Sequence, residues 1–246
     1  MNNTPLDKIL FLDIETVPQQ FSLTELPESL HNLWSEKIDS LKRRMPDRYL
    51  DEEGDEEATF RREAGIYAEF GKIVCISVGF IHMKDGVKYC RIKSFYGSDE
   101  KALLTEFSTM LTRFMHTFDH QLCGHNIKEF DVPYIARRML INGLPLPKAI
   151  QVAGKKPWEV KFIDTLELWR FGDYKNYTSL KLLTAIFDIP TPKDDIDGSQ
   201  VASVYYEEND IERIATYCQK DVVATAQLYL KFCGETMISS EHIEYV

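Results

Sequence analysis

The fold is decided by a short apolar stretch near the start of the chain, residues 8–15, which reads KILFLDIE. Because Ile, Leu and Phe fill most of it, this pattern predicts a strand buried in the middle of a sheet. Asp13 and Glu15 lie two residues apart, so their side chains project from the same face of that strand. Two carboxylates in a core lose hydration and repel each other, and a divalent cation or a proton resolves that conflict. The alternative is that the strand has already left the core here and that both acids are solvated.

The composition around this stretch is that of a globular protein. The chain has 246 residues, 44% of them hydrophobic and 28% charged, which excludes a disordered, collagen-like or low-complexity chain. Its longest apolar run, residues 73–81, is far shorter than the roughly 20 residues needed to cross a bilayer. Residues 1–8 are polar and do not resemble a secretion signal. We therefore expect no membrane association and a cytoplasmic location.

Charge and cysteine content narrow the classes of function. Lys and Arg number 29 and Asp and Glu 39, a net charge of −10, which argues against a protein that grips phosphates by bulk electrostatics. An enzyme that meets phosphate through cations held by acidic residues needs no basic surface. The five cysteines are an odd number with no C-x-x-C spacing, which argues against a disulfide framework and a zinc cluster. We expect them to be buried thiols.

Strand and helix patterns are mixed along the rest of the chain. Residues 73–81 and 88–96 predict a hairpin that turns at Lys84-Asp85-Gly86, and residues 121–124 and 161–163 predict further strands. Periodicity predicts helices over residues 132–142, 179–187 and 211–232, the last with Asn209 and Glu212 as a capping pair. A further helix is capped by Ser98 or Asp99, and its predicted core stripe is Leu103, Leu104, Phe107, Met110, Leu111, Phe114, Met115 and Phe118.

Residues 18–67 differ from the rest of the chain. They carry few strand signals and several charged clusters, namely Lys42-Arg43-Arg44, Asp51-Glu52-Glu53, Asp55-Glu56-Glu57 and Arg61-Arg62. We interpret them as an insertion of helices and mobile loop. Because no repeat or Pro-rich linker divides the chain, we expect residues 1–246 to form a single α/β domain that carries this N-terminal insertion.

Three further residues are candidates for chemistry. Tyr217 and Asp221 lie four residues apart on the predicted helix 211–232, so they stack on one face beside apolar neighbours. The structural alternative for this pair is a tyrosine that hydrogen-bonds within its own helix. Asp131 precedes Pro133 at the start of a predicted helix, and taken alone it is read as a helix cap.

Taken together, the three segments resemble, in order, the three motifs of the DEDD superfamily of 3′-to-5′ exonucleases. The likeness covers residues 8–232 apart from the insertion, and three ordered motifs are far more specific than any one of them. The tyrosine four residues before the last aspartate marks the tyrosine branch (DEDDy), and the nearest likeness is to the proofreading exonuclease domain of family B DNA polymerases. The matching segments are Phe11-Leu-Asp13-Ile-Glu15-Thr16, His125-Asn126-x-x-x-Phe130-Asp131-x-Pro133-Tyr134 and Tyr217-Cys-Gln-Lys-Asp221.

The resemblance implies a ribonuclease H-like fold, with a mixed five-stranded sheet flanked by helices. It also implies that Asp13, Glu15 and Asp221 bind one divalent ion, while Asp13 binds a second whose water shell is steadied by Asp131. Two cations about 3.5 to 4 Å apart activate the attacking water and stabilise the leaving 3′ oxygen. Tyr217 would orient that water. Mg²⁺ suits such oxygen ligands, and Mn²⁺ would serve the same site.

The resemblance assigns weaker roles to other residues. Thr16, Asn126 and Phe130 match positions beside the terminal nucleotide, although the structural roles of a turn threonine, a capping asparagine and a core phenylalanine are somewhat favoured for them. Asp164 is read as a helix cap that could also support the site. His125 is not expected to be a general base, and residues 214–220 hold no histidine such as the histidine branch of the superfamily requires. The run Asp194-Asp195-Ile196-Asp197 is read as a solvated loop.

The expected substrate is a nucleic acid with a free 3′ end, and the polymerase-like likeness favours DNA over RNA. The competing interpretation is a nuclease-fold module that has lost catalysis and binds nucleic acid or a polymerase partner. All five catalytic positions are present, which weighs against it. The sequence ends about 14 residues after Phe232, so we expect any link to DNA replication or repair to run through a partner.

Overall fold

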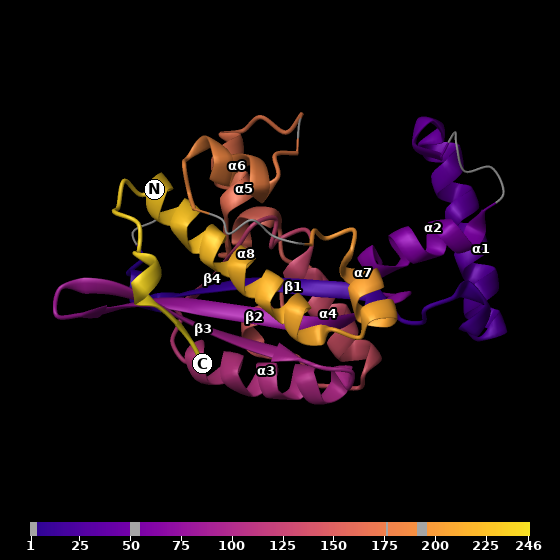
Figure 1. Ribbon diagram of the computed structural model, residues 1–246, viewed down its shortest axis with the longest axis horizontal. Helices are drawn as coiled ribbons and strands as arrows, with labels where there is room; N and C mark the ends of the chain where they lie inside the picture. The colour runs from indigo at the N-terminus through magenta and orange to yellow at the C-terminus, as the bar shows by residue number, and fades with distance from the viewer. Residues whose placement is uncertain (1–3, 50–54, 176, 191–195) are drawn as a thin grey trace.

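The computed structural model describes residues 4–49, 55–175, 177–190 and 196–246 and shows an α/β fold built on a mixed six-stranded sheet (Figure 1). The strand order is β5-β4-β1-β2-β3-β6, so β1 lies in the interior. β1 pairs antiparallel with β2 and parallel with β4, and β6 pairs parallel with β3. The strands are β1 (Ile9–Pro18), β2 (Gly71–Lys84), β3 (Val87–Tyr96), β4 (Gln121–Gly124), β5 (Ile163–Asp164) and β6 (Ile243–Tyr245).

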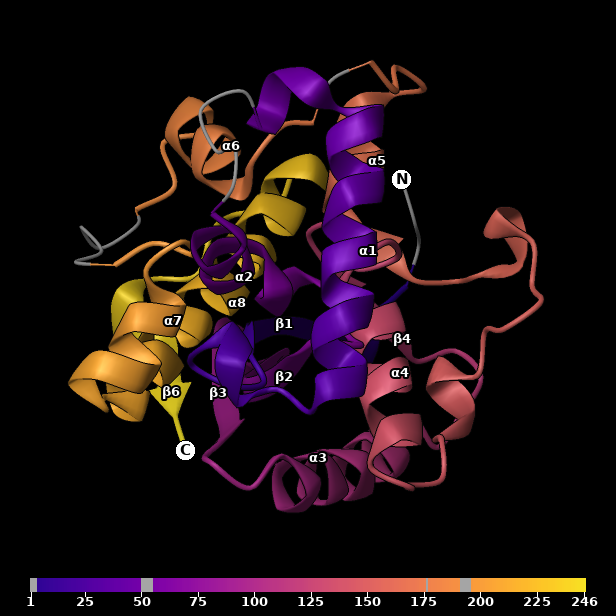
Figure 2. The ribbon, with the colours of Figure 1, turned by 90° about the vertical axis from the view of Figure 1, so that its right-hand side faces the viewer.

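The helices cover both faces of this sheet. Figures 1 and 2 show α8 along one face and α3 with α4 against the other, while α1 and α2 lie beyond the end of β1. In the described residues, the helices are α1 (Glu28–Arg44), α2 (Glu56–Glu63), α3 (Glu100–Phe114), α4 (Asp131–Ile141), α5 (Thr165–Arg170), α6 (Leu180–Ile186), α7 (Val201–Ser203) and α8 (Ile211–Phe232). A π-helical turn, Val204–Glu208, continues α7. Within the parts of the chain described, no helix combines the length and apolar character of a membrane span.

The alternation of β1 sends its side chains into two different cores. Leu10, Leu12 and Ile14 pack with α3 and α4 on one face. Ile9 and Phe11 point the other way, where Phe11 meets the ring of Tyr229 on α8 edge-on at 5.9 Å. Asp13 and Glu15 share the parity of Phe11 and therefore face α8.

Gly79 on β2 lies where side chains of α8 and β3 crowd the strand, so that an added side chain would displace them. A Cβ there would lie 2.6 Å from Ile92 Cδ1 and 2.9 Å from Val222 Cγ1. The hairpin between β2 and β3 turns at Asp85 and Gly86 with φ of 51° and 80°, the two positive values that a type I′ turn requires. The predicted Gly turn is therefore confirmed. The close approach at Gly79 brings β2 directly beneath the helix that carries Tyr217 and Asp221.

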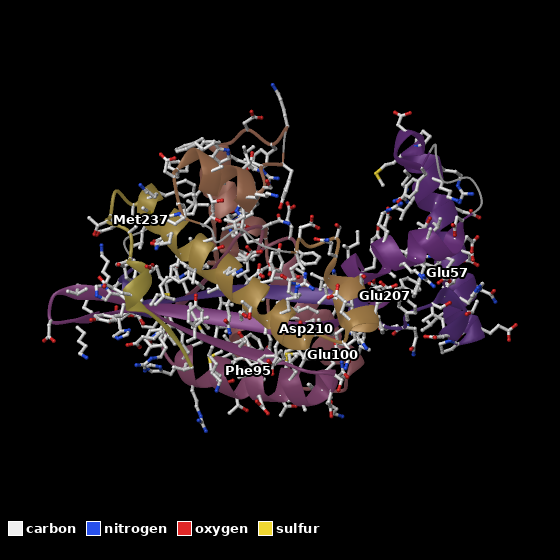
Figure 3. The ribbon with its side chains drawn as sticks, viewed as in Figure 1. Glu57, Phe95, Glu100, Glu207, Asp210 and Met237 are labelled. Atoms are coloured by element: carbon white, nitrogen blue, oxygen red, sulfur yellow. The ribbon has the colours of Figure 1, made fainter. Side chains whose placement is uncertain are left out.

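The insertion forms a small core of its own. The buried ring of Trp34 on α1 meets Phe60 of α2 at 5.2 Å and Phe70 at 5.1 Å between ring centroids. Glu57, labelled on α2 in Figure 3, accepts a hydrogen bond from the backbone N–H of Leu23 at 2.9 Å. The predicted helices are present, whereas Asp51-Glu52-Glu53 lies outside the described residues.

Several local predictions are wrong. The sheet has six strands rather than five, because β6 has only three residues and is held by its pairing with Cys90–Ile92. Asp210 caps α8 by accepting from Arg213 N–H, while Asn209 takes a left-handed φ of 55° and makes no such cap. Phe118 lies beyond the end of α3 and is 94% exposed, so it does not extend that helix's core stripe.

Other local predictions are confirmed. Asp99 caps α3, and Asp164 caps α5. The bounds of α8 are those expected from periodicity. The cysteines are free thiols, of which Cys75, Cys90, Cys123 and Cys218 are buried and Cys233 is half-buried.

Candidate active site

A cavity of about 880 Å³ opens between β1, α4, α6 and α8. Its wall contains all five residues that the sequence marks as catalytic candidates, although they come from three distant segments. Two of the three predicted nucleotide contacts, Asn126 and Phe130, also line it. The five candidates are Asp13, Glu15, Asp131, Tyr217 and Asp221.

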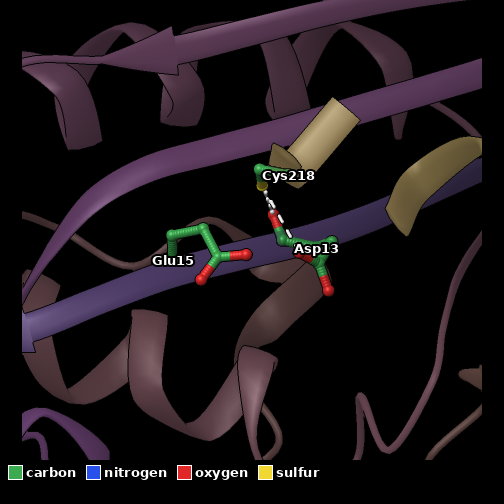
Figure 4. Close-up of side chains that lie close together, drawn as sticks. All are labelled: Asp13, Glu15 and Cys218. Atoms are coloured by element: carbon green, nitrogen blue, oxygen red, sulfur yellow. Dashed lines mark hydrogen bonds between the residues drawn. The ribbon is translucent and has the colours of Figure 1, made fainter. Parts of the chain in front are cut away.

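Asp13 and Glu15 occupy the floor, and the ladder with β2 fixes them there. Asp13 lies opposite Ser77 and Glu15 opposite Cys75, and the register shifts immediately after Glu15. Figure 4 shows the two side chains on the same side of β1, with the Glu15 carboxylate directed toward Asp13. The strand therefore stays in the core at this point and does not leave it. Of the two readings of the Asp13–Glu15 pair, the buried one is correct for Glu15, which is only 8% exposed.

Burial and the mutual repulsion of the carboxylates disfavour the ionised form of these acids. Burial, followed by the charges of Asp221 and Glu15, raises the pKa of Asp13 well above its usual range. Burial and the charge of Asp221 do the same to the pKa of Glu15. Burial raises the pKa of Asp131 to about 7, although its acceptance of the Ile14 backbone N–H opposes the rise. A nearby positive charge would therefore favour the ionised form of each of these three carboxyl groups.

The donor set fits a hard divalent cation. Among the described residues, neither Asp13 nor Glu15 forms an ion pair with lysine or arginine, and the nearby charges that act on both are carboxylates. Clustered carboxylate oxygens at a water-accessible cavity are the ligands that Mg²⁺ and Mn²⁺ prefer. A bound cation would remove the repulsion that otherwise forces protons onto these acids. One basic side chain, the exposed Lys181 of α6, also lines the cavity.

α8 supplies the opposite wall through one stripe of its surface. Tyr217, Asp221 and Ala224 are spaced by four and then three residues, which places them on the same face toward the cavity. Burial, the carboxylates of Asp221, Glu15 and Asp13, and hydrogen bonding to Asp221 together raise the pKa of Tyr217 far above its usual value. The phenol therefore keeps its proton at neutral pH and remains a hydrogen-bond donor. The hydrogen bond within the helix, which was the structural alternative for this pair, is thus present alongside the approach to the cavity.

Asp131 does not cap its helix. α4 begins at Asp131 itself, and Phe130 is the capping residue without a side-chain hydrogen bond. Instead the Asp131 carboxylate is buried and faces the cavity floor, where Ile14 donates its backbone N–H to it. The cap prediction fails because residues 126–130 form a tight turn that lets α4 begin at Asp131, two residues before Pro133.

Asp164 holds that turn in place. Its carboxylate accepts backbone N–H groups from Asn126 at 3.0 Å and Lys128 at 3.2 Å, in addition to the α5 cap on Leu166 at 2.9 Å. Asn126 takes a left-handed φ of 66°, a conformation that asparagine tolerates better than most residues. Asp164 therefore combines the expected cap with support of the loop that carries Asn126, Phe130 and Asp131.

His125 acts as a tie between loops. Its Nε2–H donates to the Thr178 carbonyl at 2.9 Å, and its Nδ1 lies 2.9 Å from the Thr165 hydroxyl. Burial lowers its pKa, so the ring is neutral. With both nitrogens engaged, the imidazole positions residues 177–178 at the mouth of the cavity.

The structure separates Thr16 from the other candidates. Thr16 follows the register shift, does not line the cavity, and hydrogen-bonds to the Tyr134 phenol. Sequence reasoning missed Tyr177 and Lys181 at the cavity wall and Cys218 beside Asp13. Tyr177 and Lys181 lie outside the three motifs and gave no signal. Of the acidic run 194–197, only Ile196 and Asp197 are described: Ile196 is buried, and Asp197 is exposed at the cavity wall.

Comparison with known families places the chain in one class of enzyme. Residues 66–243, more than half of the chain, match the family described as a predicted 3′-5′ exonuclease related to the exonuclease domain of PolB. The chain therefore belongs to this family of 3′-5′ exonucleases. The matched range contains Asp131, Tyr217 and Asp221, while Asp13 and Glu15 precede it. No curated protein matches the chain.

Proposed function

We propose that this protein is a metal-dependent 3′-5′ exonuclease of the tyrosine branch, with a ribonuclease H-like fold, that releases 5′-mononucleotides from single-stranded DNA or RNA, with DNA the favoured substrate. The convergence of Asp13, Glu15, Asp131, Tyr217 and Asp221 on one cavity carries this proposal. Residues separated by about two hundred positions meet there, and the pKa values of Asp13 and Glu15 are raised. Within the described chain, neither of these two carboxylates forms an ion pair with a lysine or arginine. Perturbed groups that converge in a cavity are typical of catalytic sites.

The carboxylates would hold two divalent ions, Mg²⁺ or Mn²⁺. Asp13, Glu15 and Asp221 would bind one, and Asp13 would share the second, with Asp131 holding its water. When bound, such ions lower the pKa of the attacking water and stabilise the leaving 3′ oxygen. The chain's own part is to fix the oxygens: the β1–β2 ladder holds Asp13 and Glu15, and Asp164 holds the turn before Asp131.

Tyr217 would place the water that attacks the phosphate. Its hydroxyl is protonated at neutral pH and lies at the cavity wall near Asp221, Glu15 and Asp13. A phenol in this state donates one hydrogen bond and accepts another, so it can hold a water in one orientation without binding the cation.

We propose substrate contacts in two parts of the structure, the cavity wall and the insertion. Asn126 and Phe130 at the cavity wall are candidates to contact the terminal nucleotide, and Thr16 would act from outside the cavity lining. The clusters of the insertion are candidates to guide a strand, although Arg61 is already paired with Glu57 at 2.8 Å. Lys42, Arg43 and Arg44 form the last turn of α1. A DNA replication or repair protein is the proposed partner.

The test uses the purified full chain with Mg²⁺ and single-stranded DNA or RNA labelled at either end. With a 5′ label, the proposal predicts a ladder of progressively shorter products, and with a 3′ label it predicts immediate release of a labelled 5′-mononucleotide. EDTA should abolish both. Asp13→Asn should be inactive, whereas Asp39→Asn, the same change at an exposed position of α1, should match the parent. Shortening from the 5′ end, undiminished cleavage in EDTA, or binding without cleavage would reject the proposal, and the last result would indicate an inactive binding module.

A further inference from the structure

Cys218 lies directly against the carboxylate floor of the cavity. It follows Tyr217 on α8 and is turned toward β1, where its Sγ lies 3.4 Å from both the Oδ2 and the backbone oxygen of Asp13. Figure 4 shows this sulfur beside Asp13, with the Glu15 carboxylate next to it. The thiol donates a weak hydrogen bond here and has no assigned role in exonuclease chemistry.

The spacing of these three groups is that of a small tetrahedral metal site. One sulfur of Cys218 and one carboxylate oxygen each of Asp13 and Glu15 all lie within 4.8 Å of one another. A tetrahedral ion with a metal–sulfur bond of about 2.3 Å and a metal–oxygen bond of about 2.1 Å has a sulfur–oxygen edge of about 3.6 Å. The 3.4 Å between Cys218 Sγ and Asp13 Oδ2 is close to that edge.

Glu15 provides the independent indication that a ligand belongs at this point. It is 8% exposed, and within the described residues its carboxylate has no hydrogen-bond or ion-pair partner. Its side chain nevertheless lines the cavity and is directed toward Asp13. A buried carboxylate without a partner is costly, and a cation is the group that would satisfy it.

We propose that Asp13, Glu15 and Cys218 form a mixed oxygen–sulfur site that binds a thiophilic ion, of which Zn²⁺ is the type, and that this mode excludes the catalytic ions. The inference rests on the proposed function only in that both use the same two carboxylates. On binding, a metal–sulfur bond forms, the Cys218 S–H bond breaks, and the proton leaves to solvent. Water from the cavity, which Asp13 and Glu15 line, would complete the coordination of the ion. Mg²⁺ prefers oxygen ligands, so it does not recruit the sulfur.

The consequence is competition for one pair of carboxylates. An ion drawn toward Cys218 occupies Asp13, which the two-ion arrangement needs for both of its metals. Zn²⁺ bound in this mode would therefore hold the enzyme in an inactive state until it is removed by a chelator. The site should also select among metal ions, because an ion that accepts thiolate binds here more tightly than a hard ion of the same charge.

Cobalt(II) reports this site without any nuclease assay. The metal-free full chain is titrated with Co²⁺, and we expect visible ligand-field bands of a tetrahedral ion together with a near-ultraviolet sulfur-to-cobalt charge-transfer band. Cys218→Ser, which keeps the size but replaces sulfur with oxygen, should lose the charge-transfer band. Cys233→Ser removes the half-buried thiol at the end of α8 and serves as the matched control, which should retain it.

Zn²⁺ affinity gives the second measurement. Competition with a chromogenic chelator should show Zn²⁺ bound at least about tenfold more weakly by Cys218→Ser than by the parent or Cys233→Ser, since one of three protein ligands is lost. Cys218→Ala serves if the serine variant does not fold, and Glu15→Gln should weaken Zn²⁺ binding as well. Retention of the charge-transfer band in Cys218→Ser, its loss in Cys233→Ser, or equal Zn²⁺ affinities would overturn the proposal.

The experiments distinguish failure of the mixed oxygen–sulfur site from failure of the proposed exonuclease activity. A sulfur-to-cobalt band in a protein that does not cleave DNA with Mg²⁺ would leave the thiolate site standing and reject the exonuclease. Magnesium-dependent cleavage without any such band would do the reverse.

Discussion

Asp131→Asn should stabilise the metal-free protein, and the gain should depend on pH. Asp131 is 3% exposed, and its carboxyl pKa is raised from 3.8 to about 7 in the folded state. A raised carboxyl pKa means that the folded state binds this proton more tightly than the unfolded state does. Stability from this group is therefore complete below about pH 4 and is lost as the pH rises toward 7.

The size of the effect follows from the pKa difference. A rise from 3.8 to about 7 is about three units, and at about 1.4 kcal/mol each this is a penalty of about 4 kcal/mol above pH 7. Asparagine carries no charge, yet its side-chain oxygen can still accept the Ile14 N–H. We therefore expect the Asn variant to gain up to about 4 kcal/mol over the parent at pH 8 in EDTA and to gain nothing at pH 4.

Urea unfolding in EDTA between pH 4 and 8 measures this difference in the free energy of unfolding. Asp39→Asn, an identical change at an exposed position of α1, should leave the pH profile of the parent unaltered. Saturating Mg²⁺ should narrow the gap at pH 8, because the parent gains a ligand that its carboxylate helps to hold. A difference between Asp131→Asn and the parent that does not vary with pH, or a less stable variant at pH 8, would refute the reasoning.

Three further substitutions test other parts of the structure. Asp13→Ala removes the ligand expected to serve both ions, so turnover should fall by several orders of magnitude while the melting temperature in EDTA holds or rises, since repulsion from Glu15 is relieved. Tyr217→Phe keeps the ring and deletes the hydroxyl, so single-turnover cleavage should slow by roughly one to three orders of magnitude while Mg²⁺ binding by calorimetry persists; an unchanged rate would make the hydroxyl structural. Glu100, labelled in Figure 3, pairs with the buried Arg138 guanidinium at 2.6 Å. Glu100→Gln should lower the free energy of unfolding in urea by about 3–5 kcal/mol, because it leaves that guanidinium without its counter-charge.

The parts of the fold that sequence predicts well are those whose signal is local. β1 and β2 carry continuous apolar runs, a Gly turn marks the β2–β3 hairpin, and α8 carries a sustained helical period, so their positions follow from the residues alone. β6 could not be predicted in this way, because its three residues are too few to show a period and form a strand only by pairing with the edge of β3. Asn209 fails for a related reason: whether it or Asp210 caps α8 depends on the backbone of the π-helical turn before it, which composition does not encode.

The site divides along the same line. The spacing of Asp13 and Glu15 predicts one shared face, and the spacing of Tyr217 and Asp221 predicts another, but only the packing of α8 on β1 turns the two faces toward one cavity. Cys218 illustrates what spacing cannot supply. On the helix it reads as an apolar neighbour of Tyr217, and that reading is accurate, since its side chain is buried. Its chemical meaning comes from the strand it is buried against. A thiol over aliphatic side chains is inert packing, while a thiol 3.4 Å from a carboxylate that we propose binds metal can serve as a further ligand. The same contact that closes the core beneath the cavity therefore places a soft donor within reach of the cation that we propose these carboxylates bind.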